Sequence, residues 1–432
     1  MPNSSRRHFL KTTAAAAGIA SAGKLPAVEP PLVPSNSAGK PAPLPGPDEP
    51  IRIGIIGPGG MGTAHCHAIM GLNKNAREKV EIVAVADVCK PRLDNAHKVC
   101  SEGQPGITVT PYRNYKDLLA REDIHGVLIA SPEHWHAQHA ADAIHAGKDV
   151  YCEKPMTLRL EQAVNLRKIV KDSDRVFTVG TQHITQNKYH AARKLIREGA
   201  IGKPVSSQTS YCRNSKDGEW NYYGIDPTVV PGPNLDWAEW CGPAGQAPFD
   251  TLVYHRWRRY RHWSTGIIGD LLVHQMTPML FTLELGWPTR VVAQGEHMID
   301  MDMENHDQVH MAIEFEDKHH MQILGSTCNE YGLEKMIRGY KGNIFLNSGN
   351  CVLRPERIWS DEIEEQVVQC EPVSDHDEMR LNWLNCIRTR EEPIGNVDLA
   401  TKVIVGVDLA TRSMWGGRAF WFDKDRMWAS PA

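Results

Sequence analysis

Short apolar runs alternate with amphipathic stretches between residues 51 and 155. The runs typical of buried strands are Ile51–Gly57, Glu81–Asp87, Gly126–Ala130 and Asp149–Cys152. Helical patterns lie between them at Thr63–Leu72 and Tyr115–Arg121, and another helix is expected from Ser131-Pro132, with Ser131 as N-cap, to Gly147. Because strands and helices alternate with short connections, this segment is predicted to be an α/β unit with a parallel, doubly wound sheet.

A second group of strands is expected further along the chain. It begins with Val176–Thr181. Apolar and polar residues then alternate, as in strands with one buried face, in Val205–Tyr211, Thr289–Gly295, Gln308–Phe315 and His320–Ser326. Val397–Trp415 is apolar at helical spacing and is expected to pack back on this sheet or on the first unit. Residues 156–432 are therefore predicted to form a second α/β domain.

The first fifty residues differ in composition from the rest. Ser5-Arg6-Arg7-His8-Phe9-Leu10-Lys11 is a twin-arginine pattern, and an Ala-rich apolar stretch ends in Ala20-Ser21-Ala22 before Gly23. Residues 1–22 are predicted to be a signal peptide read by the twin-arginine export machinery, which implies a periplasmic protein. Residues 23–50 are rich in Pro, Ser, Ala and Gly, and are predicted to be a linker.

Composition narrows the function classes. The chain has 432 residues, and 48 Lys+Arg against 52 Asp+Glu give a net charge of -4, so no basic block favours a nucleic-acid partner. No apolar run is long enough to cross a bilayer, so no stable membrane insertion is expected. The pairs His134/His136, His65/His67 and His319/His320 lack further ligands at metal-site spacing, and no metal is predicted.

A glycine motif follows the first predicted strand. Gly57-Pro58-Gly59-Gly60-Met61-Gly62 is a G-x-G-x-x-G at the start of a predicted helix. Gly57 would allow the tight turn, Gly59 the approach of a pyrophosphate, and Gly62 the close packing of helix on strand. Asp87 ends the next strand, where a carboxylate bonds the adenosine ribose hydroxyls and repels a 2′-phosphate. The cofactor is therefore predicted to be NAD rather than NADP, held at Gly57, Gly59, Gly60, Met61, Gly62 and Asp87.

Three further motifs carry a family resemblance. They are Ser131-Pro132 with His136, Ala146-Gly147-Lys148 leading to Glu153-Lys154-Pro155, and Gly269-Asp270-Leu271-Leu272-Val273-His274. With the glycine loop they make the chain, from Ile51 to its C-terminus, resemble the glucose–fructose oxidoreductase / inositol dehydrogenase (Gfo/Idh/MocA) family. The resemblance implies an N-terminal Rossmann domain, residues 51–155, and a C-terminal α/β domain on a large, mostly antiparallel open sheet. It also implies a homodimer or homotetramer formed through that sheet.

The resemblance assigns roles to residues. Lys154 would take the proton of the hydroxyl that is oxidised, although a turn lysine is more often merely solvated. Asp270 and His274, four residues apart, would share a helix face over the substrate, with His274 moving a proton. Ser131, His136, Glu153 and Gln182 are expected at the cofactor, and His183 and Trp263 at the substrate. Glu133 departs from the Asn that is usual after the Ser-Pro pair, and Pro278 departs from an Asp.

One segment is unusually rich in aromatic residues and arginines. It runs from Trp220 to Trp263 and contains Trp237, Trp240, Trp257, Arg256, Arg258, Arg259 and Arg261. Aromatic faces suit the C–H surface of a sugar, and Arg suits its hydroxyls or a carboxylate. At least three of the five tryptophans are expected to be core residues instead.

The predicted function is NAD-dependent hydride transfer to or from a hydroxyl of a sugar, glycoside or polyol. The cofactor is expected to be tightly bound, because an exported enzyme has no free NAD pool. Two alternatives remain. One is an NAD-dependent glycosidase that works by transient oxidation and elimination, and the other is a non-catalytic sugar- or cofactor-binding protein.

Overall fold

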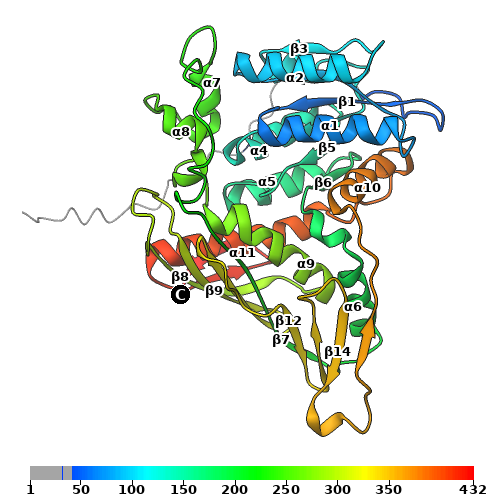
Figure 1. Ribbon diagram of the computed structural model, residues 1–432, viewed down its shortest axis with the longest axis vertical. Coiled ribbons are helices and arrows are strands. Elements are labelled where there is room, and N and C mark those ends of the chain that lie inside the picture. The colour runs from blue at the N-terminus through cyan, green and yellow to red at the C-terminus, as the bar shows by residue number, and fades with distance from the viewer. Residues whose placement is uncertain (1–31, 33–40) are drawn as a thin grey trace, which may run out of the picture. The chain divides into compact units, whose positions relative to one another are not determined.

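The computed structural model describes residue 32 and residues 41–432 (Figure 1). The predicted signal peptide, residues 1–22, lies outside the described residues, as does most of the predicted linker. None of the helices in the described part of the chain combines the length and apolar character that crossing a bilayer requires.

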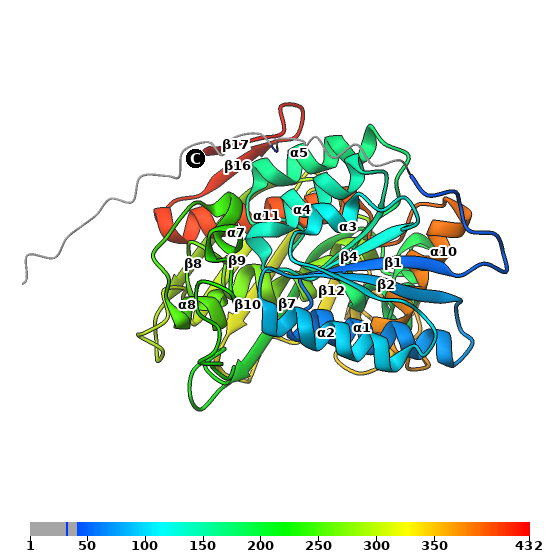
Figure 2. The same ribbon diagram turned by 90° about the horizontal axis from the view of Figure 1, so that it is seen from above.

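A parallel sheet forms the first half of the structure. Its strands, in the spatial order β3-β2-β1-β4-β5-β6, are β1 (Ile51–Ile56), β2 (Val80–Ala86), β3 (Thr110–Tyr112), β4 (Gly126–Ile129), β5 (Asp149–Cys152) and β6 (Phe177–Val179). Its helices are α1 (Gly60–Lys74), α2 (Lys90–Gly103), α3 (Tyr115–Leu119), α4 (Glu133–His145) and α5 (Leu160–Lys171). Figure 2 shows α1 and α2 on one face of the sheet and α3, α4 and α5 on the other. The doubly wound prediction is confirmed.

Two details differ from the sequence-based expectation. The parallel sheet continues past residue 155, because α5 crosses over and β6 pairs with β5, so that the sheet ends at Val179. The N-cap of α4 is Pro132 rather than Ser131, whose hydroxyl instead contacts Nδ1 of His139 at 3.0 Å. The helix stops as expected, with Gly147 at φ +74°.

A second sheet of eleven strands forms the other half of the described chain. Its path is β15-β14-β13-β12-β7-β10-β9-β8-β16-β17, with β11 paired to β7. Only β10 and β7 pair in parallel, so the expected large, mostly antiparallel sheet is confirmed. The strands are β7 (Pro204–Asn214), β8 (Pro288–Glu296), β9 (Gln308–Phe315), β10 (His320–Ser326), β11 (Cys328–Asn329), β12 (Met336–Gly339), β13 (Gly342–Phe345), β14 (Cys351–Pro355), β15 (Gln366–Val368), β16 (Phe420–Asp423) and β17 (Trp428–Pro431).

Helices contribute side chains to the cores of both sheets. α11 (Val397–Gly416) places Ala400 and Ile404 among the core residues of the parallel-sheet domain, and places Val405 and Leu409 in the core under the second sheet. α10 (Asp375–Thr389) buries an apolar side against α1 and β1. α6 (Asn187–Arg197) and α9 (Val273–Leu283) contribute to the core under the second sheet.

The segment between β7 and α9 returns to the parallel sheet. It includes α7 (Trp237–Cys241) and α8 (Thr251–His255). The N–H of Lys90 donates to the carbonyl of Asn234 at 2.7 Å, and the N–H of Asp236 donates to the carbonyl of Val88 at 3.1 Å. These bonds anchor the segment beside the carboxyl end of β2, which is the edge where a doubly wound sheet binds its ligand.

Candidate active site

A cavity of about 830 Å³ lies between the glycine loop and the segment that follows β7. Its wall includes Gly57, Gly59, Gly60, Met61, Asp87, Ser131, His136, Glu153 and Lys154 from the first domain. From the second domain it includes Arg213, Trp220, Tyr222, Tyr223, Trp240, Tyr254, Trp257, Arg258 and Asp270. This volume lies within the range of ligand pockets, and both polar and aromatic groups face it.

The glycine loop has the geometry that a dinucleotide requires. A Cβ on Gly57, whose φ is +74°, would lie 2.5 Å from the backbone nitrogen of Ser131. A Cβ on Gly62 would lie 2.8 Å from the carbonyl oxygen of Gly57. Around Gly59 and Gly60, by contrast, a Cβ would meet no atom of the described residues within 4 Å. The first turn of α1 has no side-chain cap, so its N–H groups remain available to a pyrophosphate.

Asp87 lies at the end of β2, as predicted, and lines the cavity. Its Oδ1 accepts the N–H of Cys89 at 2.8 Å. Burial raises the pKa of this carboxyl to about 6, against the lowering effect of the Cys89 N–H and of Arg92 and Arg113. Both arginines also line the cavity, and no sequence motif points to either of them.

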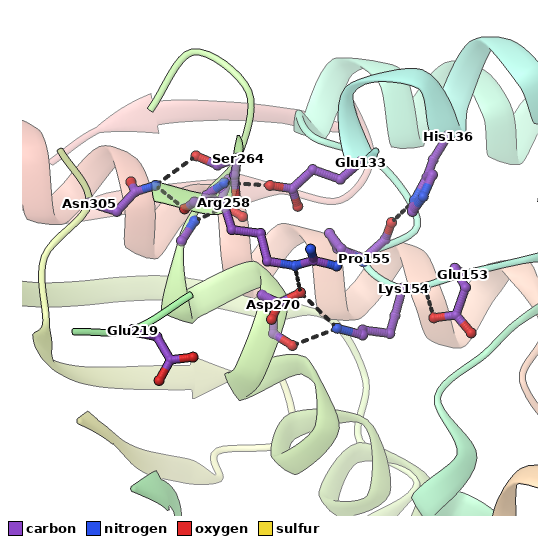
Figure 3. Close-up of polar contacts among 12 residues, drawn as sticks. Glu133, His136, Glu153, Lys154, Pro155, Glu219, Arg258, Ser264, Asp270 and Asn305 are labelled. Atoms are coloured by element: carbon purple, nitrogen blue, oxygen red, sulfur yellow. Dashed lines mark hydrogen bonds and ion pairs between the residues drawn. The ribbon is translucent and has the colours of Figure 1, made fainter. Parts of the chain in front are cut away.

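Lys154 and Arg258 converge on one carboxylate, that of Asp270 (Figure 3). Nζ of Lys154 donates to Oδ1 of Asp270 at 2.9 Å and to its carbonyl oxygen at 2.8 Å, and Nε of Arg258 donates to Oδ1 at 2.8 Å. Burial alone would raise the pKa of the Asp270 carboxyl, but the two cations hold it far below its usual range. Asp270 belongs to a π-helical turn, Ile268–Leu272, directly before α9. Such turns are frequent at functional sites.

His274 lies one turn beyond Asp270, at the start of α9. Its carbonyl oxygen accepts from Nδ1 of His183 at 3.0 Å, and the two imidazole rings lie 5.3 Å apart. Burial, together with the charges of Lys154 and His183, holds the pKa of His274 well below its usual value, so the ring is neutral at pH 7. Among the described residues, nothing bonds its Nδ1. Neither His274 nor His183 is part of the cavity wall formed by the described residues.

Glu153 belongs to a buried chain of polar groups. Its Oε1 contacts Nε2 of His65 at 2.8 Å, while Nδ1 of His65 accepts from Nε of Arg380 at 2.9 Å. Burial would raise the pKa of Glu153, but His65 and Lys154 lower it to about 2. Oε2 accepts the backbone N–H of Lys154 at 3.2 Å. The carboxylate therefore fixes the backbone that carries Lys154.

The remaining predicted site residues are placed as follows. Ser131 and His136 line the cavity, but both ring nitrogens of His136 lie against carbonyl oxygens, of Pro155 at 2.6 Å and of Ser131 at 2.8 Å. His136 thus shapes the turn after β5. Gln182 is buried and does not belong to the cavity wall in the described chain.

Trp263 is not at the cavity either. It is 3% exposed and packs among His134, Trp237 and Trp240, because these large apolar rings bury one another. The cavity is lined by three other tryptophans of the segment from Trp220 to Trp263, namely Trp220, Trp240 and Trp257. Of the four arginines in that segment, Arg258 lines the cavity and the other three do not.

Glu133, which departs from the family pattern in sequence, is a buried carboxyl beside the site. It is 1% exposed, and Oε1 accepts the N–H of Thr265 at 2.8 Å, which ties α4 to the segment leading to Asp270. Within the described chain Oε2 has no hydrogen-bond partner. Burial raises the pKa of this carboxyl to about 7, and the charge of Asp270 acts in the same direction.

This carboxyl should make stability depend on pH. Between about pH 4.5 and 7 the unfolded chain releases the Glu133 proton while the folded chain keeps it, so stability falls as pH rises. Gln at position 133 cannot ionise. Between pH 5 and pH 8 the free energy of unfolding of Glu133→Gln should therefore fall by on the order of 3 kcal/mol less than that of the wild type. Urea denaturation at both pH values measures this. The exposed Glu122→Gln serves as control, and a wild-type pH dependence in Glu133→Gln would contradict the assignment.

Comparisons with known proteins agree with this geometry. The profile of the oxidoreductase family GFO_IDH_MocA, NAD-binding Rossmann fold, matches residues 51–181, and that of its C-terminal alpha/beta domain matches residues 193–421. An inositol 2-dehydrogenase of Klebsiella pneumoniae is 31% identical over 176 residues, covering 40% of this chain and 48% of that protein. An alpha-N-acetylgalactosaminidase of Shewanella oneidensis is 30% identical over 244 residues, covering 52% and 51%.

The alignments thus span about half the length of these curated relatives. Among solved structures, levoglucosan dehydrogenase in complex with NADH is similar in fold, with a TM-score of 0.65 and 18% identity, over 89% of this chain and 99% of that one. The two profiles together cover the parallel sheet, the second sheet up to the start of β16, and the elements that hold Lys154 and Asp270. The chain belongs to the Gfo/Idh/MocA oxidoreductase family and has its NAD-binding Rossmann domain.

Proposed function

We propose that this protein transfers a hydride between NAD and a hydroxyl-bearing carbon of a sugar, glycoside or polyol. The observation that carries the proposal is the Lys154–Asp270 pair, with Nζ and Oδ1 2.9 Å apart, in the same cavity as the glycine loop. The named relatives and neighbours, an inositol 2-dehydrogenase and a levoglucosan dehydrogenase, support this substrate class.

Lys154 and Asp270 have different roles in the transfer of the hydroxyl proton. When bound, the nicotinamide supplies the site that accepts or returns the hydride. In the reduction direction the Lys154 ammonium group gives a proton to the carbonyl oxygen of the substrate, and in the oxidation direction its neutral amine, formed once that proton has been released, takes the proton of the hydroxyl. Asp270 fixes Nζ with two oxygens. His274, one turn further on, is neutral, and its Nδ1 has no hydrogen-bond partner among the described residues.

We further propose that the cofactor stays bound between turnovers. The segment after β7 is anchored beside β2 and adds Trp240 and Tyr254 to the cavity wall, opposite the glycine loop. Protein purified without added nucleotide should release NAD or NADH on denaturation, as mass spectrometry would detect. Addition of polyols and sugars should then change the absorbance of the bound cofactor at 340 nm. Protein that carries no nucleotide and reduces no added NAD would overturn the proposal.

Glycoside cleavage is a second candidate, favoured by the similarity to the alpha-N-acetylgalactosaminidase. The same Lys154 and Asp270 would serve, because oxidation of a sugar hydroxyl acidifies the neighbouring C–H and permits elimination. Release of the aglycone from a nitrophenyl glycoside, without net NADH formation, would identify this activity. Net NADH formation without release of the aglycone would exclude it.

Export through the twin-arginine pathway to the periplasm is proposed from Ser5–Lys11 alone. Arg6→Lys combined with Arg7→Lys should move the protein from the periplasmic to the cytoplasmic fraction of the producing cell. An unchanged distribution would remove this proposal.

A homodimer or homotetramer is proposed through the open face of the second sheet. Val292, Ala312 and Gln322 lie side by side there, exposed and uncharged, on β8, β9 and β10. Light scattering after size exclusion should give a multiple of the chain mass, and Ala312→Arg should lower it.

A further inference from the structure

We propose that the substrate of this site is an anionic carbohydrate, whose carboxylate or phosphate ester is bound by Arg213 and Arg258. The inference rests on the proposed function and names the substrate class more narrowly. It follows from the arrangement of charges and unpaired donors on the cavity wall next to Lys154.

Arg258 presents unpaired donors to the cavity. Its Nε bonds Oδ1 of Asp270, whereas Nη1 and Nη2 make no hydrogen bond with any of the described residues. The guanidinium lies 4.2 Å from the ring centre of Trp257 and 5.9 Å from that of Tyr223. The side chain is therefore held by the carboxylate and by stacking, while its outer edge remains free for a ligand.

Arg213, on β7, is held in a similar way. Its Nη2 forms an ion pair with the buried carboxylate of Glu219. That carboxylate also accepts from the Tyr222 hydroxyl at 2.8 Å and from the Ser215 hydroxyl at 3.1 Å. Nη1 of Arg213 has no hydrogen-bond partner in the described part of the chain, and the residue lines the cavity.

The two arginines lie at the same end of the cavity. The ring of Tyr222, bonded to the same carboxylate as Arg213, lies 4.9 Å from the ring of Tyr223, which lies beneath Arg258. Arg258 in turn shares Asp270 with Lys154. Both guanidinium groups thus belong to the part of the cavity where the hydroxyl would react.

The carboxylates at this end of the cavity leave some donors of the two arginines unpaired. Asp270 is shared by Lys154 and Arg258, and Glu219 by Arg213 and two hydroxyls, whereas the carboxylate of Glu153 contacts His65 and the backbone N–H of Lys154. Within the described chain, none of them bonds Nη1 or Nη2 of Arg258 or Nη1 of Arg213. A carboxylate or phosphate of the ligand would accept such N–H groups of Arg in a planar, two-bond geometry, which a neutral sugar does not offer.

The aromatic rings beside the arginines suit the rest of such a ligand. Tyr222 and Trp257, which are not buried, line the same region and offer faces to the C–H surface of a sugar ring. Trp220 also lines the cavity. Trp220 holds a φ of +61° although it is not a glycine, and it is 1% exposed. A conformation of this kind persists where the surroundings impose it, as they do at ligand sites.

The test compares matched sugars on the protein with its bound cofactor. The pairs are D-glucuronate with D-glucose, D-galacturonate with D-galactose, and D-glucose 6-phosphate with D-glucose. Calorimetry measures affinity even if no hydride is transferred, and absorbance at 340 nm measures oxidation. We expect at least one anionic member to bind at least about tenfold more tightly than its neutral partner. The uronates and the phosphate distinguish the two sources of the anion.

Variants at position 213 test whether Arg213 causes the preference for anionic over neutral sugars. Arg213→Gln should reduce the anionic-to-neutral affinity ratio about tenfold, and Arg213→Lys, which keeps the charge but loses the planar fork, should reduce it less. Lys216→Gln removes the same charge from an exposed neighbour and should leave the ratio unchanged. Bound nucleotide and circular dichroism confirm that each variant folds.

The outcomes separate the inference from the proposed function. Neutral sugars that are bound and oxidised as well as the acids would leave the oxidoreductase standing and overturn the inference. If no anionic sugar binds more tightly than its neutral partner, the inference is wrong whether or not hydride is transferred. Tight anion binding without any reduction of the cofactor would support the inference and overturn the proposed function.

Discussion

Lys154→Met is expected to slow reduction of the bound cofactor by about 10³-fold, because general acid–base catalysis contributes roughly 10²–10⁴. Methionine keeps the unbranched stem but removes Nζ, which is the group that Asp270 holds with its carboxylate and carbonyl oxygens. The glycine loop is untouched, so bound nucleotide should remain at the wild-type level. Single-turnover absorbance at 340 nm gives the rate, and mass spectrometry of the denatured protein gives the occupancy.

Two comparisons make this result specific. Lys74→Met removes an exposed lysine at the end of α1 and should keep the wild-type rate. Asp270→Asn should also slow the reaction, because Lys154 and Arg258 would lose the carboxylate that positions them. A Lys154→Met protein that retains a third or more of the wild-type rate would remove Lys154 from the proton transfer.

Local sequence signals predicted the glycine loop and the carboxylate that follows β2. The turn at Gly57, the close packing at Gly62 and the carboxylate at the end of β2 each depend on a few consecutive residues, so a motif can represent them. The strand Val176–Thr181 is also predicted from consecutive residues. Its pairing with β5 depends on the tertiary structure, however, and for this reason the parallel sheet extends beyond the predicted domain boundary at residue 155.

The rest of the site depends on contacts between distant residues. Lys154 meets Asp270 116 positions away, Glu133 meets Thr265 132 positions away, and His65 meets Arg380 315 positions away. A family motif identified Lys154 and Asp270, but no spacing rule connects the other pairs. Trp263 illustrates the converse error, because an aromatic side chain at a site and one in a core have the same sequence signature.

The glycine loop supplies the second large effect. Gly57→Ala should destabilise the fold and abolish nucleotide retention, because the new Cβ would lie 2.5 Å from the nitrogen and 2.6 Å from the Cα of Ser131. These are backbone atoms of β4's connection to α4, which cannot move without displacing both elements. The left-handed φ of +74° adds its own strain, so a loss of at least about 1–3 kcal/mol in unfolding free energy is expected. Urea denaturation of nucleotide-free protein measures it.

Gly59→Ala separates binding from folding at the same loop. A Cβ there meets no described atom within 4 Å and φ at Gly59 is -68°, so the fold should lose only about 1 kcal/mol, the cost of alanine at a helix N-cap. The methyl group would nevertheless occupy the space through which the backbone approaches a pyrophosphate, so nucleotide occupancy should fall. Gly71→Ala, in α1 and also without a contact, is the control and should keep full occupancy. Full occupancy in Gly59→Ala would show that the pyrophosphate does not lie against this loop, and wild-type stability in Gly57→Ala would show that the close approach to Ser131 is not required.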